Sequence, residues 1–293
     1  MQPEIRTGRV VVASAAAGVL LAVLWSYEFV DSVIGDNVAD AMLGHDAKAE
    51  AIVGTTAGLL FAFVSGLAGT FTACNIAMAA SVGPMAQASA TSPTRAVVRG
   101  IGLLAAGMCA VSASYGVIGV LIGDRLPQLS TDRVGDMPVR IIQSSVVFGL
   151  VGLALIYLGL AALHVVPDPF TRHPQWRVVA LGALIGGFLI GRPYPLFNKL
   201  FHWAVETEQP LVGAAAFVLQ SLGNIALVTI IFAILVAATR GRFLRALTAN
   251  PRRAAVVSGS LLVALGVFTV VYWDVRVPSM FGFGWFPVLF YNQ

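Results

Sequence analysis

The sequence has little charge. Only 11% of its 293 residues are Asp, Glu, Lys or Arg, against about 25% in an average soluble chain. Hydrophobic residues make up 58% of the chain, and the mean hydropathy is +0.85. This composition excludes an ordinary soluble domain and indicates an integral membrane protein surrounded by lipid. The net charge of +4 comes without a basic patch that carries interleaved aromatic residues, so nucleic acid is not an expected partner.

Cysteine and histidine are also scarce. The two cysteines, Cys74 and Cys109, both fall inside apolar segments, which excludes an extracellular disulfide framework. The four histidines do not cluster, and the chain has no metal-ligand spacing, phosphate-binding glycine loop or nucleophile elbow. We therefore expect neither a bound metal nor a cofactor.

What the sequence does contain is a series of long apolar segments. They cover residues 10–30, 53–80, 97–123, 143–166, 178–201, 212–239 and 254–273. Each is long enough to cross a bilayer as a helix. The first follows basic residues, as a signal peptide would, but Glu28 and Asp31 come after it without a clean cleavage site, so we expect a retained helix. The sequence thus predicts an all-α membrane protein with seven transmembrane helices.

The loop charges predict the orientation of these helices. Eleven arginines lie in the loops on one side, and six basic residues, Arg276 among them, lie on the other. Cytoplasmic loops carry the excess of Lys and Arg, so the N-terminus is predicted to be cytoplasmic and the C-terminus external, in the inner cell membrane. The aromatic tail, residues 276–293, is too short to span. It is predicted to lie in the outer interface or to pack on a partner within a membrane complex.

One apolar segment becomes polar before it ends. After Gly66 and Gly69, the chain places Thr72, Cys74 and Asn75 at membrane depth. Glycine permits close backbone approach, and thiol and amide groups in hydrocarbon need partners or a wet cavity. Two interpretations stay open: a small-residue packing face between helices, or a functional break in the helix.

A second segment, 178–201, contains the run Arg192, Pro193, Tyr194 and Pro195. Two prolines one residue apart remove two backbone donors and push the preceding residues out of helical geometry, so the helix must break here. The carbonyls that the break frees need partners. Arg192 is predicted to face a cavity, to pair with another group or to snorkel to the interface, because a charge inside a membrane is costly.

The two interrupted segments each lead a set of three helices. After an N-terminal region (1–51), a core (52–275) therefore divides into halves, 52–167 and 178–275, of opposite orientation. Such an inverted repeat with broken leading helices predicts a binding site at the membrane midplane. Gln220 and Asn224 are four residues apart on one helix face and support the same centre, with helix–helix hydrogen bonding as the alternative.

These features resemble the CcdA/DsbD transmembrane family, within the wider LysE-type superfamily. In that family the first helix of each half carries a Pro-Cys motif, commonly followed by another proline. The run 72–77 around Cys74 matches the first motif with alanines in place of the prolines, and the run 192–195 matches the second with Tyr194 in place of the cysteine. The resemblance implies a thiol–disulfide electron carrier or maturation factor that passes reducing equivalents across the membrane, with a thioredoxin-like redox protein as partner.

Because Tyr194 stands where the family has its second motif cysteine, three functions stay open. A two-electron thiol carrier needs two cysteines, and Cys109 is the remaining candidate to pair with Cys74, provided that their Cα atoms come within about 7 Å. In the second function the same fold moves a small solute or ion. In the third the chain is a non-catalytic subunit of a membrane complex. The candidate catalytic residues are Cys74 and Cys109; the candidate substrate-binding residues are Thr72, Asn75, Arg192, Pro193, Tyr194, Pro195, Gln220 and Asn224.

Overall fold

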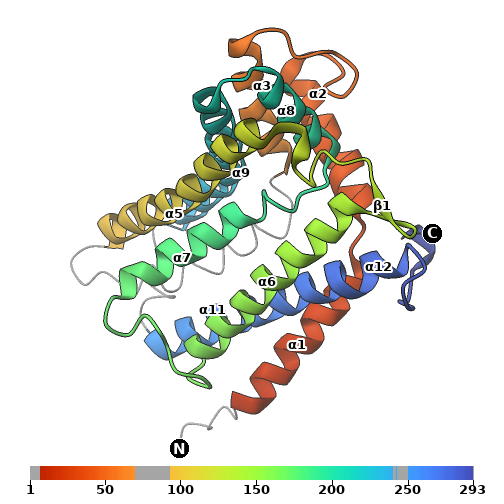
Figure 1. Ribbon diagram of the computed structural model, residues 1–293. Helices are drawn as coiled ribbons and strands as arrows, with labels where there is room; N and C mark the ends of the chain where they lie inside the picture. The colour runs from red at the N-terminus through yellow and green to blue at the C-terminus, as the bar shows by residue number, and fades with distance from the viewer. Residues whose placement is uncertain (1–6, 70–92, 240–241, 243–249, 293) are drawn as a thin grey trace, which may run out of the picture.

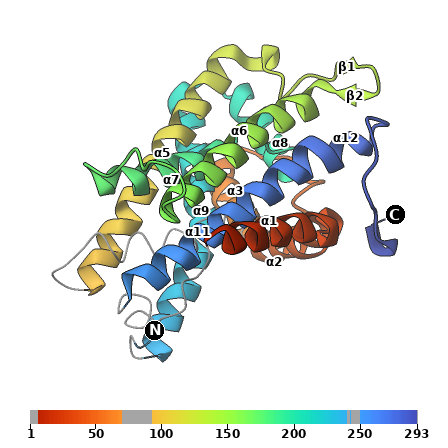
Figure 2. The same cartoon turned by 90° about the horizontal axis from the view of Figure 1, so that it is seen from below.

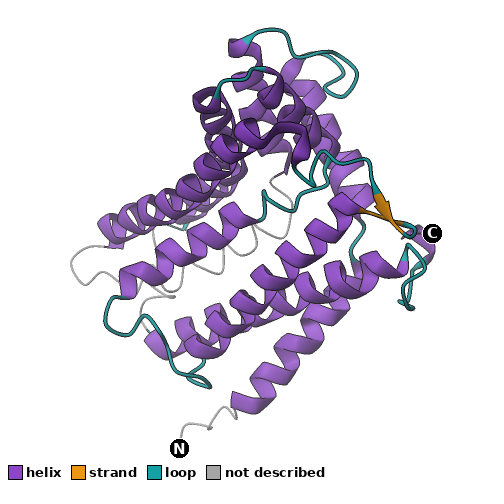
Figure 3. Cartoon of the chain, in the orientation of Figure 1, coloured by secondary structure: helices purple, strands orange, loops and turns teal. Residues whose placement is uncertain are grey.

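The computed structural model describes residues 7–69, 93–239, 242 and 250–292. This part of the chain is almost entirely helical (Figure 3), as predicted. Its α-helices are α1 (Thr7–Leu24), α2 (Asn37–Leu43), α3 (Thr55–Ala68), α5 (Pro93–Ile122), α6 (Val139–Ala162), α7 (Pro174–Gly187), α8 (Pro195–Glu206), α9 (Pro210–Ala238), α11 (Pro251–Val270) and α12 (Val277–Ser279). Wider π-helical turns form η1 (Glu28–Asp36) and η4 (Val271–Arg276), and tighter turns form η3 (Gly123–Arg125) and η5 (Phe290–Asn292). Two short strands, β1 (Arg133–Val134) and β2 (Met137–Pro138), pair antiparallel.

Four helices in the described residues are long and apolar enough to cross a membrane. They are Thr7–Leu24, Val98–Arg125, Val139–Ala162 and Arg252–Ser279. Two shorter apolar helices, Thr55–Ala68 and Pro210–Ala226, accompany them. These lengths and compositions are those of an integral membrane protein.

The long helices pack in two connected groups (Figures 1 and 2). In one group α11 lies between α6 and α1; in the other, α5 runs along both α7 and α9, and α3 runs along α9. The chain begins and ends at opposite ends of this bundle (Figure 1), with α2, α8 and the β1–β2 hairpin gathered at the end away from the N-terminus.

Glycines allow the helices to approach closely. In α6 and α11, Gly152 lies against Gly266 and Gly159 against Gly259: a Cβ added at Gly152 would lie 2.9 Å from the Gly266 carbonyl oxygen, and one added at Gly159 would lie 2.8 Å from that of Gly259. Small residues at matched positions are a common way to pack helices in lipid, where hydrophobic burial gives no driving force between them.

The first helix is shorter than predicted. The predicted span 10–30 ends as α1 at Leu24, and the predicted loop 31–51 contains η1 and α2. The reason lies at the other end of the chain, because the C-terminal segment supplies donors for the last carbonyls of α1. Tyr291 donates its hydroxyl to the Leu24 carbonyl at 2.9 Å, and Arg276 Nη1 donates to the carbonyls of Ala22 and Trp25 at 2.6 Å each.

Arg276 is therefore not the external loop charge that the sequence suggested. The last long helix continues through η4 and α12 as far as Ser279, and the Arg276 side chain is fully buried. Its guanidinium lies over the rings of Tyr272 and Phe286, 5.2 and 6.0 Å from their centroids. Cation–π contacts and the two carbonyl acceptors at Nη1 replace part of its hydration shell, while Nε and Nη2 are buried without a hydrogen-bond partner.

Candidate functional site

The break predicted at Arg192–Pro195 is confirmed. Helix α7 ends at Gly187, and α8 begins at Pro195, whose fixed φ suits the first position of a helix. Between them the chain turns, and residues 192–194 are neither helix nor turn. The carbonyls of this stretch face the protein interior, where each needs a donor.

Side-chain amides supply those donors. Gln128 Nε2 donates to the Arg192 carbonyl at 2.9 Å and to Asn198 Oδ1 at 2.6 Å. Gln143 Nε2 donates to the Ile190 carbonyl at 2.5 Å, and Asn198 Nδ2 reaches the Pro193 carbonyl at 3.5 Å. Because Gln128 and Gln143 come from the η3–β1 loop and from α6, residues that precede the break by about 50 to 65 positions in the chain hold it in place.

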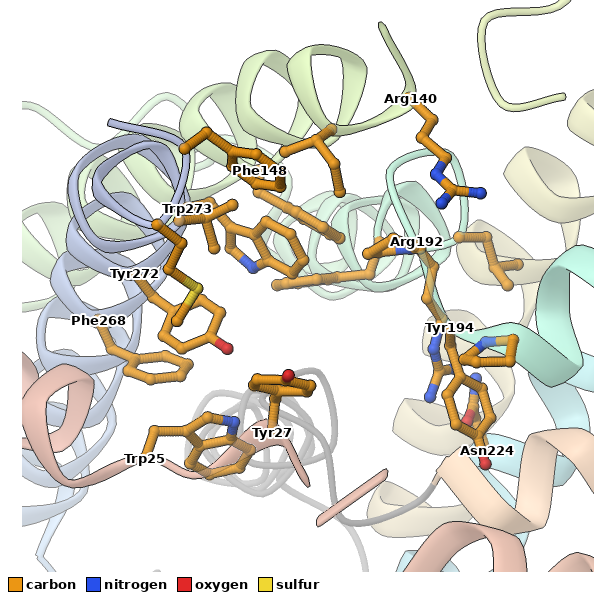
Figure 4. A pocket seen from close by; sticks show the side chains of 18 of the residues that line it. Trp25, Tyr27, Arg140, Phe148, Arg192, Tyr194, Asn224, Phe268, Tyr272 and Trp273 are labelled. Carbon is orange, nitrogen blue, oxygen red and sulfur yellow. The ribbon is translucent and has the colours of Figure 1, made fainter. Parts of the chain in front are cut away.

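A cavity of about 490 Å³ opens beside the break (Figure 4). Aromatic side chains from the α1–η1 junction, α6, α11 and η4 form its near-continuous apolar wall; those labelled in Figure 4 are Trp25, Tyr27, Phe148, Phe268, Tyr272 and Trp273. On the opposite side stand Arg192, Tyr194 and Asn224, and Arg140 lies above them. The size is typical of a small-molecule site, in which an apolar lining surrounds a few polar groups.

Arg192 is the charged group buried at this cavity. Its side chain is 8% exposed, and the guanidinium lies 5.2 Å from the centre of the Tyr194 ring. Its one hydrogen bond within the described chain is a long one, from Nη2 to the Gly69 carbonyl at 3.5 Å, and none of the ion pairs between described residues includes it. The absence of a side chain at Gly69 makes room for it, because a Cβ there would lie 2.8 Å from Arg192 Cζ.

Asn224 adds a buried amide with an unpartnered oxygen to the same side of the cavity. It is 5% exposed, and its Oδ1 is a buried atom without a hydrogen-bond partner. One helical turn earlier on α9, Gln220 is fully buried with both amide atoms unpartnered. The two residues therefore share one buried face, as the sequence predicted, and that face packs on Gly66 of α3. Buried amides without partners are rare and require an explanation.

Tyr194 connects the break to the segment that follows α1. Its hydroxyl donates to Asp36 Oδ1 at 3.3 Å, and Asp36 forms an ion pair with Lys48. Lys199, on the first turns of α8, donates to the carbonyls of Ala47, Lys48 and Glu50. The residues that follow α2 are thus fastened to the cavity rim by side chains of the 194–199 stretch.

The same loop carries its own local hydrogen bonds. Asp46 Oδ1 accepts from the backbone N–H groups of Lys48 at 2.8 Å and Ala49 at 2.9 Å. These hydrogen bonds, first that from Ala49, hold the pKa of Asp46 below its usual value.

The structure brings together five of the predicted site residues and separates others. Arg192, Pro193, Tyr194, Pro195 and Asn224 all line the cavity. Thr72, Cys74 and Asn75 lie outside the described residues. Gln220 lies one turn away from the lining, and Cys109 is a free, half-buried thiol on α5, packed at the edge of the core rather than in the cavity wall.

Sequence reasoning missed the aromatic wall and the amides that support the break. Trp25, Tyr272 and Trp273 lie near the ends of the predicted apolar segments, where aromatic residues usually belong to an interfacial belt, so the sequence alone predicts them at the membrane interface. Gln143 carried a usable signal as an amide at the start of an apolar segment, which needs a partner in lipid. Gln128 lies in a predicted loop, where an amide can bind water, so its position carried no such signal.

Comparisons with protein-family models, with curated proteins and with solved structures find no match for this chain. The resemblance to the CcdA/DsbD family therefore stays a prediction, and the argument for function depends on the cavity itself.

Proposed function

We propose that this chain is a membrane transporter of a small solute and that the cavity beside the α7–α8 break is its substrate site. The observation that carries the proposal is Arg192: a buried guanidinium at a helix break, facing a cavity, with no carboxylate partner among the described residues. A buried charge costs several kcal/mol unless something pairs with it. A substrate that enters and leaves supplies that partner intermittently.

The packing of the helices supports the inverted repeat on which the proposal depends. If the halves 52–167 and 178–275 are exchanged, α3 takes the place of α7, α5 that of α9, and α6 that of α11. Under this exchange the α3–α9 contact becomes the α7–α5 contact, and both are observed. The α5–α9 and α6–α11 contacts are each unchanged by the exchange, and both are observed as well. We infer seven spans in this arrangement, with the N-terminus cytoplasmic and α1 added outside the repeat, against α11.

The two helix pairs that the exchange relates, α3–α9 and α7–α5, both have glycines at their contacts. On α3 and α9, Gly66 and Gly223 lie against each other, and on α7 and α5, Gly182 and Gly107 each lie against the backbone of the facing helix. In transport folds of this kind, one half rocks against the other around a site at their junction.

Accessibility from both membrane faces tests the transport proposal without knowledge of the substrate. In a Cys74→Ser/Cys109→Ser background, Leu189→Cys places one thiol in the cavity wall. An impermeant thiol reagent should modify it in right-side-out and in inside-out vesicles, because a transporter exposes its site to each side in turn. Val53→Cys, on the exposed segment before α3, should react only from outside, and Arg172→Cys, between α6 and α7, only from inside. Modification of Leu189→Cys from one side alone would contradict transport.

The thiol-carrier function makes a different prediction for the same background. A carrier loses all function when either sulfur is removed, because disulfide exchange needs both. Two-sided modification of Leu189→Cys in the cysteine-free background would therefore separate transport from thiol chemistry. The position of Cys109 outside the cavity lining favours transport.

A further inference from the structure

The cavity has two chemically distinct sides. On the wall formed by η4, α6 and α11, the rings of Phe148 and Trp273 stack with centroids 4.3 Å apart, and those of Trp25 and Phe268 lie 5.3 Å apart. Ser145 fixes this wall by donating its hydroxyl to the Trp273 carbonyl at 2.8 Å. The wall offers ring faces and edges already held in place, which suits a flat apolar group.

The opposite side is positive and carries no acid. Arg192, Arg140 and Lys48 all line the cavity, and Asp and Glu are absent from its described lining. Residues 70–92, which are not described, contain no acidic residue in the sequence. Lys48 has its own partner in Asp36. Among the described residues, the buried Arg192 and the exposed Arg140 are thus the cations left to meet an anion from outside the protein, and Asn224, whose Oδ1 is buried without a hydrogen-bond partner, lies beside Arg192 (Figure 4).

We propose that the ligand is an organic anion with a flat apolar body: a carboxylate or phosphate group held by Arg192 and Asn224, and a ring held against Trp273 and Phe148. This proposal deepens the proposed transport function and rests on the same cavity. A guanidinium presents its donors in a fork that matches the two oxygens of such an anion, while Asn224, by turning its side-chain amide, can donate its NH₂ to the same oxygens. Charge and shape therefore both favour this class over sugars, cations and straight acyl chains.

Binding to the purified protein tests the ligand class. In phosphatidylcholine nanodiscs, 3-phenylpropionate should bind, as followed by titration calorimetry. Three analogues change one property each: 3-phenylpropanamide lacks the charge, 3-phenylpropylamine inverts it, and hexanoate lacks the ring. All three should bind at least about tenfold more weakly, because each loses either the charge-assisted hydrogen bonds or the ring contacts.

Substitutions locate the site. Arg192→Met should raise the Kd of 3-phenylpropionate about 100-fold and Arg192→Lys about tenfold, because lysine keeps the charge but loses the fork. Trp273→Leu should raise it about tenfold. The matched controls Arg125→Gln and Trp176→Leu, both exposed and outside the cavity, should leave it unchanged.

Each contrary result has a definite meaning. Equal binding of the amide, or wild-type affinity in folded Arg192→Met, would overturn the anion site. Loss of 3-phenylpropionate binding in nanodiscs that contain phosphatidylglycerol would assign the site to an anionic lipid instead and overturn the soluble ligand. Two-sided modification of Leu189→Cys without binding of 3-phenylpropionate would leave transport standing and overturn the ligand class. Binding of 3-phenylpropionate together with modification of Leu189→Cys from one side alone would leave the ligand class standing and overturn transport.

Discussion

Two arginines are buried in the described part of the chain, and their surroundings differ. Arg276 is fully buried, and it donates two short hydrogen bonds to carbonyls at the end of α1 while lying over two rings. Arg192 is 8% exposed, makes a single long hydrogen bond to Gly69 and borders a cavity. The protein thus holds Arg276 through Nη1 and two rings, although its Nε and Nη2 are buried without a hydrogen-bond partner, whereas Arg192 borders a space that a ligand can enter.

These surroundings indicate a structural role for Arg276 and a ligand-binding role for Arg192. Burial alone is costly for both, so each must have a compensating partner. For Arg276 the partners are the carbonyls of Ala22 and Trp25, which the shortened α1 leaves free. For Arg192 the described chain supplies one long hydrogen bond to the Gly69 carbonyl and the ring of Tyr194, and the Oδ1 of Asn224, on the same side of the cavity, is unpartnered. A site that binds and releases a ligand is expected to leave its polar groups unsatisfied when empty.

The largest expected effect is on the structural arginine. Arg276→Met should lower the free energy of unfolding by about 3 kcal/mol, because two charge-assisted hydrogen bonds are lost and their carbonyls stay buried. The measurement is the thermal unfolding midpoint in detergent. Arg125→Met, at an exposed position, is the matched control and should leave the midpoint unchanged. An Arg276→Met protein as stable as wild type would remove the distinction between the two arginines.

A smaller effect, on ligand binding, is expected from a substitution at Gly69, which follows α3 and contacts Arg192. A methyl group at residue 69 would collide with the guanidinium, so Gly69→Ala should displace Arg192 and weaken 3-phenylpropionate binding about tenfold. Gly102→Ala, on α5 with open space around it, is the control and should leave binding intact. Unchanged affinity in Gly69→Ala would mean that the position of Arg192 does not decide binding.

The amides that hold the break are expected to contribute less. Gln128→Leu removes the donor to the Arg192 carbonyl and should destabilise the protein by about 1 kcal/mol. The exposed Gln209→Leu should have no such effect. If thermal unfolding shows no difference between the two variants, the break is held by other contacts.

The smallest effect concerns the loop after α2. Because the pKa of Asp46 is lowered in the folded protein, the stabilisation that it gives is present above the unfolded value of 3.8 and is lost as the pH falls through the lowered pKa. The stability difference between wild type and Asp46→Ala should therefore be constant from about pH 5 to 8 and shrink in stronger acid. Unfolding midpoints measured across this range check it; a difference that varies near neutral pH would point to another group.

The long helices and the polar side of the cavity, which carries Arg192 and Tyr194, could be predicted from the sequence. Apolar length predicted the helices, and two prolines with an arginine predicted the break, because these residues act on the backbone locally. The end of α1 was beyond such reasoning, since its donors come from Arg276 and Tyr291, more than 250 residues later. The aromatic wall was missed for the same reason: Trp25 and Trp273 come to line the same cavity as Arg192 only through the packing of α1 and α11. The predicted pair of Cys74 with Cys109 remains untested.

Arg192 is proposed to serve a ligand, whereas Arg276 serves the fold by holding the end of α1. The most direct measurement is the unfolding midpoint of wild type, Arg192→Met and Arg276→Met, each with and without 3-phenylpropionate. A ligand at 100 times its Kd stabilises its receptor by about 2.7 kcal/mol. We predict that wild type shows this shift, that Arg276→Met starts lower but still shows it, and that Arg192→Met starts no lower than wild type and does not respond. An Arg192→Met protein that is destabilised without ligand, yet stabilised by it as much as wild type, would contradict the claim.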